Sequence, residues 1–231
     1  MIPILYEDNH CLAVDKPAGL LSQSDATGDP SVVDLARAYL KTRYNKPGNV
    51  YLGLLHRLDR PVSGVLLLAK TSKAAARLSA SFRAHDVAKR YLAVVQGLVP
   101  LQEGVWEDSI AKDTATNRAR TVDLGEGKHA ELGFRVLRRA QDRTLVLLAP
   151  KTGRGHQLRV QLSSRGLPIL GDTKYGASST LDALDGRRRI ALHAFELAIT
   201  HPTRRQSLVV RSPVPADWPA AMRPDPASID R

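Results

Sequence analysis

The stretch HRLDRPVSGVLLLAKT, His56–Thr71, joins a short charged segment to a long apolar run. The apolar part, Gly64–Ala69, predicts a β-strand that is buried on both faces. Asp59 comes before this strand, next to Arg60 and Pro61, in a segment that we expect to form a turn. A carboxylate on a loop at the end of a buried strand lies where functional sites are often built on a rigid scaffold.

Outward from this strand, helix-like and strand-like segments alternate irregularly. Apolar residues at helical spacing predict one helix from Ser31 to about Tyr39, a second capped by Ser72, and a short third, Gln157–Ser164, that ends at Gly166. Further strands are expected at Ile4–Tyr6, Cys11–Val14, Tyr91–Val95, Ala130–Leu137, Thr144–Ala149, Leu192–Thr200 and Ser207–Arg211. Because strands outnumber helices without regular alternation, the sequence predicts an α+β fold, with a mixed, largely antiparallel central sheet and flanking helices.

The distribution of proline suggests where the main domain ends. The chain has 231 residues, enough for one large domain or two small ones. Five of its 14 prolines lie between Pro213 and Pro226. We therefore expect a main domain over residues 1–212 and a Pro-rich tail over residues 213–231 that is extended or loose, with Trp218 as its anchor.

The charge balance indicates a polyanionic partner. The chain has 34 Lys and Arg against 23 Asp and Glu, which leaves a formal net charge of +11. Such an excess favours nucleic acid or an acidic membrane surface. We expect no membrane span and no secretory signal, because neither apolar pattern is present. A single cysteine, Cys11, excludes an internal disulfide and a multi-cysteine zinc site. We expect a cytoplasmic protein that binds RNA or DNA.

The charges around Asp59 suggest its chemistry. Residues 54–100 contain eight Lys or Arg but only two acids, Asp59 and Asp86. A carboxylate among cations stays ionised, which a carboxylate nucleophile requires. The alternative is a structural ion pair with Arg57 or Arg60.

A second cationic segment is KTGRGHQLRVQLSSRGLPILGDTKYG, Lys151–Gly176. It has five Lys or Arg and one acid, Asp172. Gly153 and Gly155 predict a tight turn before a helix, with free N–H groups that can face a phosphate. A plain tight turn is the alternative.

These segments resemble the motifs of the RluA-type RNA pseudouridine synthase family. ILYEDNHCLAVDKPAGL resembles the opening motif and HRLDRPVSG the catalytic motif. KRYLAVVQG (Lys89–Gly97) resembles the tyrosine-bearing strand, the segment from Lys151 the third motif, and LHAFELAITHP (Leu192–Pro202) the late strand pair. The resemblance runs in order from about Ile4 to Pro202. It implies a pseudouridine synthase-like fold with a catalytic cleft, in which residues 1–212 form the catalytic domain. Larger relatives also carry an N-terminal RNA-binding domain, which we do not expect here because the chain opens on the first motif.

The resemblance also implies roles for individual residues. Asp59 matches the catalytic aspartate. Tyr91 matches the tyrosine that stacks on the target base and helps to remove its carbon-5 proton. Arg159 matches the basic residue that pairs with the aspartate and keeps it ionised. Leu158 matches an aliphatic residue that lines the pocket, and Arg57 an arginine that occupies the space left by a flipped base.

The implied reaction converts specific uridines of structured transfer or ribosomal RNA to pseudouridine. It neither gains nor loses atoms or electrons, so we expect no cofactor and no metal. RNA is the expected partner, with no membrane and no obligate protein partner, and the protein is expected to be a monomer. Three first steps are open: attack on the anomeric carbon, attack on the base, or proton removal at the sugar's 2′ carbon.

The chain also departs from the family's pattern. Pro61–Val62 stands where many relatives have Asp-Thr, and Gly155 replaces a common Thr or Lys. For His56, His156 and Lys70 we favour a structural role, because polar residues beside a site usually brace it. The alternative function is a non-catalytic RNA-binding or assembly module with the same fold. The presence of the aspartate, the tyrosine and the arginine together argues against it.

Overall fold

The computed structural model describes residues 2–113, 116, 118–182 and 186–229. The chain forms two compact units. Unit 1 comprises Met1–Ala88 and Ala194–Pro213, and unit 2 comprises Lys89–His193 and Val214–Arg231. Strands dominate both units, and the pairings β2–β4, β5–β9 and β8–β9 are antiparallel, so the predicted α+β class is confirmed. The predicted catalytic cleft stays a prediction.

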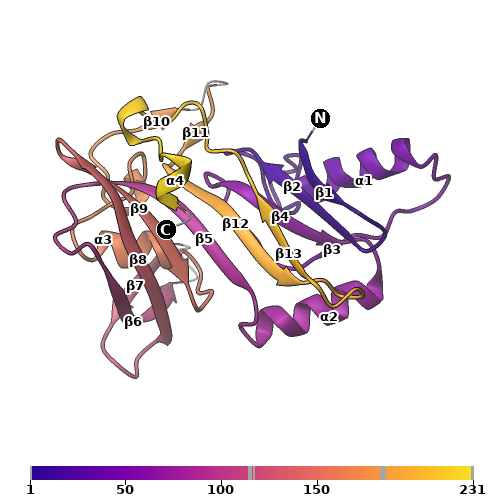
Figure 1. The fold of residues 1–231 in the computed structure, drawn as a ribbon, viewed down its shortest axis with the longest axis horizontal. Coiled ribbons are helices and arrows are strands. Elements are labelled where there is room, and N and C mark those ends of the chain that lie inside the picture. The colour runs from indigo at the N-terminus through magenta and orange to yellow at the C-terminus, as the bar shows by residue number, and fades with distance from the viewer. Residues whose placement is uncertain (1, 114–115, 117, 183–185, 230–231) are drawn as a thin grey trace. The chain divides into compact units, whose positions relative to one another are not determined.

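Unit 1 contains a sheet in the order β1-β2-β4-β12, with β3 paired to β4 and β13 to β12 (Figure 1). Its elements are β1 (Ile4–Glu7), β2 (Cys11–Lys16), α1 (Val32–Arg43), β3 (Gly53–Leu54), β4 (Ser63–Ala69), α2 (Ser72–Arg83), β12 (Leu192–Thr200) and β13 (Ser207–Arg211). Strands β2 and β4 are antiparallel, with Cys11 opposite Ala69 and Lys16 opposite Gly64. This register ties the motif that contains Lys16 to the segment that follows Asp59.

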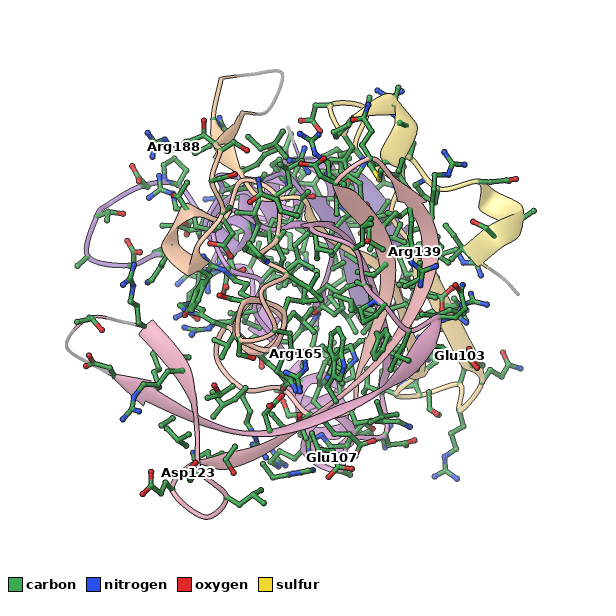
Figure 2. All side chains as sticks on the ribbon, turned by 90° about the vertical axis from the view of Figure 1, so that its left-hand side faces the viewer. Glu103, Glu107, Asp123, Arg139, Arg165 and Arg188 are labelled. Carbon is green, nitrogen blue, oxygen red and sulfur yellow. The ribbon has the colours of Figure 1, made fainter. Side chains whose placement is uncertain are left out.

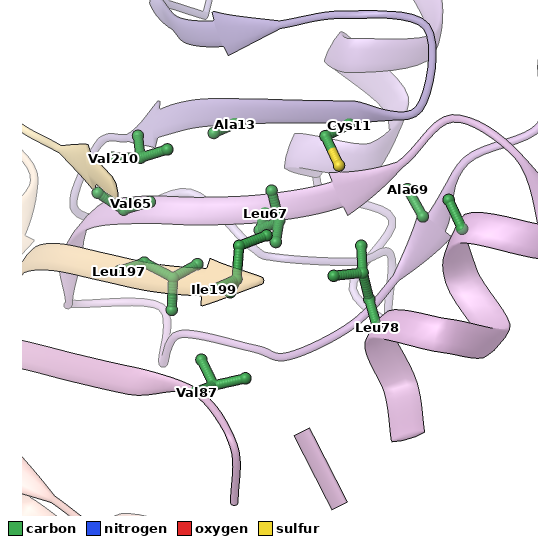
Figure 3. Packing of buried hydrophobic residues seen from close by; sticks show 11 residues of the cluster. Cys11, Ala13, Val65, Leu67, Ala69, Leu78, Val87, Leu197, Ile199 and Val210 are labelled. Carbon is green, nitrogen blue, oxygen red and sulfur yellow. The ribbon is translucent and has the colours of Figure 1, made fainter. Parts of the chain in front are cut away.

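Strand β4 lies at the centre of the unit 1 core. All seven of its residues are buried, which confirms the strand predicted from the apolar run. Leu67 packs with Leu78 of α2 and Ile199 of β12 in one hydrophobic cluster, with Cys11 among them (Figure 3). Burial of this apolar surface stabilises the strand and fixes the position of the loop that precedes it.

The two long helices of unit 1 begin at side-chain caps. Ser31 caps α1 as predicted and forms a capping box with Asp34, whose backbone N donates to Ser31 Oγ at 3.3 Å. This helix continues to Arg43, four residues beyond the predicted end. The predicted cap of α2 at Ser72 was wrong, because Thr71 is the extended residue and its Oγ1 accepts from Ala74 N at 3.2 Å. In the described part of the chain no helix is long and apolar enough to cross a membrane.

Unit 2 contains a sheet in the order β5-β9-β8-β6-β7, followed by shorter elements (Figure 1). Its elements are β5 (Ala88–Gln96), β6 (Glu103–Asp113), β7 (Arg118–Val122), β8 (Lys128–Ala140), β9 (Arg143–Pro150), α3 (Gln157–Ser163), η1 (Thr173–Tyr175), β10 (Leu181–Asp182), β11 (Arg188–Arg189), η2 (Ala220–Met222) and α4 (Pro226–Ile229). The strands corresponding to β5, β8 and β9 were predicted, whereas β6 and β7 were not. Strand β6 carries a glycine and four acids and is largely exposed along its first half, so its apolar signal is weak.

The segment after residue 213 belongs to unit 2 and is anchored there. Trp218 is 1% exposed, and its ring makes a T-shaped contact with the ring of His193. Arg138 donates to the carbonyl of Ala221 at 3.0 Å, and Arg135 to that of Ile229 at the same distance. The prediction that residues 1–212 alone form the catalytic domain stays a prediction.

Candidate active site

Asp59 lies on the loop between β3 and β4, and this loop is tightly held. The backbone N of Val62 donates to the carbonyl of Asp59 at 3.0 Å, which closes a turn. Ser22 bonds both backbone groups of Leu58, accepting from its N–H at 3.1 Å and donating to its carbonyl at 2.7 Å. The Leu58 side chain is buried. Asp59 is therefore flanked on both sides by fixed backbone.

A fully buried lysine, Lys16, holds the same loop. Its Nζ donates to the carbonyls of Pro17, Arg60 and Val62 at 2.9, 3.1 and 2.7 Å. Burial lowers the pKa of Lys16 to about 7, and the negative charge of Asp59 opposes that fall. Sequence analysis missed this residue, because a lysine at a strand end is normally solvated.

The two arginines beside Asp59 have different environments. Arg60 is held in unit 1: its Nε donates to the carbonyl of Gly19 at 3.0 Å and its guanidinium pairs with Asp29 at 2.7 Å. Arg57 is exposed. An exposed guanidinium two residues from Asp59 is available to an RNA substrate, so its predicted role in base flipping stays a reasonable prediction.

A glycine directly after the loop is required by close packing. Gly64 has a φ of +116°, and a Cβ at this position would lie 2.3 Å from the carbonyl oxygen of Ala194. Backbone atoms form this obstacle, so no side-chain movement relieves it. Gly64 therefore permits β4 to approach the start of β12 in unit 1.

His56 and Lys70 make structural contacts, in agreement with the structural role predicted for them. Nε2 of His56 accepts from the backbone N of Leu67 at 3.1 Å, and its ring stacks on Phe82 with centroids 5.0 Å apart. Lys70 forms a 2.7 Å ion pair with Glu7, and both side chains are nearly buried.

In unit 2, Arg159 makes a buried bidentate ion pair that was not predicted. Its Nε and Nη2 donate to the two carboxylate oxygens of Asp172 at 2.7 and 2.8 Å. The side chains are 6% and 1% exposed. The guanidinium also lies over the ring of Tyr175, 4.7 Å from its centroid. The orientation of Arg159 on helix α3 is thus fixed by partners within unit 2.

The other predicted residues of unit 2 lie on regular elements. Tyr91 is on strand β5, opposite Leu148 of β9, and is half-buried. Leu158 is in the first turn of α3 and 8% exposed. Asp59 belongs to unit 1, whereas Tyr91, Leu158 and Arg159 belong to unit 2, so the pairing of Asp59 with Arg159 and the assembly of these residues stay predictions.

A turn precedes α3 as predicted, but the glycines are not its cause. Neither Gly153 nor Gly155 has a positive φ, and the left-handed residue is His156, with a φ of 57°. Its Nδ1 lies 2.7 Å from the hydroxyl of Tyr175. One loop N–H is also already used, because Arg154 N donates to Oε1 of Gln157 at 3.0 Å. The structural role predicted for His156 agrees with these contacts.

A second ion pair connects the segment just after α3 to strand β6. It is formed by Arg165, which lies two residues beyond the end of the helix and is labelled in Figure 2. Its guanidinium bonds Asp108 at 2.9 and 3.2 Å and lies 4.8 Å from the ring centroid of Trp106. Gln161, on α3 itself, donates to Asp108 at 2.7 Å. These contacts fix the helix that carries Arg159 and Leu158.

One group of side chains resembles a metal site in composition but not in chemistry. Asp8, Cys11 and His201 bring potential ligand atoms within 4.8 Å of one another. Nδ1 of His201 accepts from the backbone N of Thr203 and Arg204, so the ring proton is on Nε2, which bonds Asp8 at 2.8 Å and cannot ligate a metal. Burial and the nearby charge of Asp8 raise the pKa of Cys11 to about 12. The expected absence of a metal stays a prediction.

Comparison with known proteins identifies the family. The family described as RNA pseudouridylate synthase matches residues 10–164. The dual-specificity RNA pseudouridine synthase RluA of Salmonella typhi is 36% identical over 219 residues, which cover 93% of each chain. The ribosomal large subunit pseudouridine synthase D of Nitrosomonas europaea is 35% identical over 96% of this chain, which spans only 64% of that relative.

Solved structures agree with the sequence comparison. The structure of human RNA pseudouridylate synthase domain containing 4 is similar with a TM-score of 0.76 and 26% identity, and the match covers 93% of this chain and 89% of that one. The structure of human RNA pseudouridylate synthase domain containing 1 is similar with a TM-score of 0.72 and 27% identity, and the match covers 100% of this chain and 93% of that one. The chain belongs to the RNA pseudouridylate synthase family, the enzymes that isomerise uridine in RNA.

Proposed function

We propose that this protein converts specific uridines of ribosomal RNA, transfer RNA or both to pseudouridine, with Asp59 as the catalytic carboxylate. The observation that carries the assignment of Asp59 is its rigid loop. A fully buried lysine, Lys16, donates to the carbonyls of Arg60 and Val62 after this carboxylate, and Ser22 bonds the backbone of Leu58 before it. So many contacts around a single half-buried aspartate suit a group that must be held in place for chemistry. Relatives named as ribosomal large subunit pseudouridine synthases support ribosomal RNA as the substrate, and the name of a dual-specificity RNA pseudouridine synthase leaves room for a second class of RNA.

In the proposed reaction each of the candidate residues has a separate role. The bond from the uracil N1 to the sugar C1′ breaks, the base turns, and a bond from C5 to C1′ forms. The C5 proton leaves and N1 regains one, so atoms balance without a cofactor. Asp59 attacks or deprotonates the nucleoside, Tyr91 stacks on the base and assists removal of the C5 proton, and Leu158 lines the pocket. Arg159, oriented by Asp172, supplies positive charge to the catalytic carboxylate.

Arg57 is proposed to fill the gap left by the flipped nucleotide. Taking a uridine out of its stack costs a few kcal/mol, and a planar cation can stack on the bases that remain. The net charge of +11 supplies phosphate contacts that offset the same cost. We further propose that the protein acts as a monomer in the cytoplasm, where a lone buried thiol such as Cys11 stays reduced.

Chemical mapping of pseudouridine in total RNA tests the proposal. RNA from cells with and without the gene is compared, and the deletion is complemented with the wild type or with Asp59→Asn. We expect at least one site to disappear on deletion and to return only with the wild type. A non-catalytic RNA-binding module predicts instead that the pseudouridine map is the same in all strains.

A further inference from the structure

A cluster of aromatic and cationic side chains lies in unit 1 away from the Asp59 loop. We call it the Tyr44 surface. It consists of residues from the end of α1, the following turn and the residue after β4: Tyr39, Arg43, Tyr44, Lys46 and Lys70. None of them has a role in the reaction described above.

One nearly buried carboxylate organises this surface from beneath. Glu7 accepts hydrogen bonds from the hydroxyls of Tyr39 and Tyr44 at 2.8 and 2.7 Å, and from Lys70 at 2.7 Å. Burial raises the pKa of Glu7, but these three bonds lower it by more, so the carboxylate is charged. Both tyrosines are thereby held by their hydroxyl ends.

The outward side of the surface carries a ring and positive charge. Tyr44 is 47% exposed although its hydroxyl is bonded. Arg43 and Lys46, both exposed, lie 5.8 and 5.9 Å from the centre of its ring. Nε of Arg43 also lies 3.6 Å from the carboxylate of Glu7. Residues 37–51 contain four Lys or Arg and no acid.

Lys46 has no evident structural function. Its ammonium group forms no ion pair with any residue that the structure describes, and its contact with the network around Glu7 is with the ring of Tyr44. Ordered aromatic faces between cations are typical of RNA recognition, because bases stack on the ring and phosphates bond the cations.

We propose that the Tyr44 surface is a second RNA-contact site, which binds the substrate at a distance from the target uridine. A base stacks on Tyr44, and Arg43 and Lys46 bind adjacent phosphates. This inference rests on the proposed function for the identity of the RNA. Asp59 precedes β4 and Lys70 follows it, so the seven residues of the strand separate them by about 20 Å. The surface therefore binds a flanking segment, and it contributes to affinity and to the choice of RNA without touching the reacting nucleotide.

The test uses the full chain and two RNAs: a long stem-loop substrate, and the same stem-loop trimmed to its loop and closing base pairs. Binding is measured by fluorescence anisotropy over a range of salt concentrations. Lys46→Ala should lower the salt slope on the long RNA by roughly 0.7–0.9, as expected for one phosphate contact. Tyr44→Leu should weaken binding of the long RNA by roughly 5- to 150-fold. Tyr44→Phe, which keeps the ring but loses the hydrogen bond to Glu7, should weaken it less than Tyr44→Leu. The control variant Arg83→Ala removes an exposed cation from the last turn of α2, and it should bind both RNAs with the affinity of the wild type.

Three results would overturn the proposal. The first is that Lys46→Ala binds the long RNA with the affinity and the salt slope of the wild type. The second is that the variants of the Tyr44 surface lose as much affinity for the trimmed RNA as for the long RNA, and the third is that Arg83→Ala loses as much affinity as they do. Pseudouridine formation on the trimmed RNA separates this site from the proposed function. Variants of the Tyr44 surface should retain wild-type turnover there. A wild type inactive on both RNAs would refute the enzyme assignment, and the binding comparison would still decide on the surface.

Discussion

Replacement of Lys16 by methionine tests how the Asp59 loop is held. Methionine has a similar length but no donor, so Lys16→Met leaves the carbonyls of Pro17, Arg60 and Val62 without this partner. Each buried acceptor left unpaired costs about 1–3 kcal/mol, while removal of a buried charge offsets part of that cost. We therefore expect Lys16→Met to lose activity by loosening the loop, even where much of the stability is retained.

The pH dependence of stability gives this prediction a sign and a size. Burial lowers the pKa of Lys16 from 10.5 to about 7, which corresponds to about 5 kcal/mol at 1.36 kcal/mol per pH unit. Between these values the unfolded chain holds the proton and the folded protein does not, so the stability of the wild type rises with pH. The contribution is complete above pH 10.5, decreases as the pH falls below that value, and is gone by about pH 7. Lys16→Met has no such group.

Urea unfolding of both proteins at several pH values from neutral to alkaline measures this difference. The free energy of unfolding of the wild type minus that of Lys16→Met should rise steadily with pH, by up to about 5 kcal/mol. Other titrating groups are common to both proteins and cancel in the difference. Parallel stability curves across this range would refute the account of Lys16 as a buried group with a lowered pKa.

Three further predictions concern other parts of the site. Asp172→Asn should lower the free energy of unfolding by about 3–5 kcal/mol, because Arg159 loses its buried partner. The double variant Arg159→Met with Asp172→Leu should recover much of this stability but not the activity. A urea unfolding curve of Asp172→Asn equal to that of the wild type would contradict this prediction. Arg57→Ala should leave stability unchanged and lower kcat/KM more on a structured stem-loop than on an RNA whose target uridine is already unstacked, and equal deficits would eliminate the flipping role. Gly64→Ala should destabilise the protein by at least about 3 kcal/mol, because its Cβ meets the backbone of Ala194, and an unchanged thermal unfolding temperature would show that this contact is relieved.

The parts of the fold that the sequence predicts are those that depend on local patterns. The continuous apolar run of β4 required burial on both faces, and Ser31 had the chemistry of a helix cap. Strand β6 was missed because its stability comes from pairing with β7 and β8 rather than from its own apolar residues. Long-range pairing overrides local propensity in such strands.

The same distinction applies to the site. Motif resemblance directed attention to Asp59 and Arg159, but not to the side chains that orient them. Lys16 bonds carbonyls of a segment distant in the sequence, and Asp172, thirteen positions after Arg159, lies beyond the end of α3. The turn before α3 had the expected position, yet the strained residue was His156 rather than a glycine. Partners of this kind are set by tertiary structure, which no spacing rule encodes.

The central claim is that the carboxylate of Asp59 performs the chemistry, and Asp59→Asn tests it most directly. The amide keeps the shape of the side chain but removes its charge and nucleophilicity. Release of tritium from RNA labelled at carbon 5 of uridine measures turnover, with Asp86→Asn, the same change at an exposed acid, as the control. We predict that Asp59→Asn shows no turnover but binds RNA at least as tightly as the wild type, while Asp86→Asn retains wild-type activity. Turnover by Asp59→Asn within about tenfold of the wild type, a change of only about 1.4 kcal/mol, would contradict the assignment.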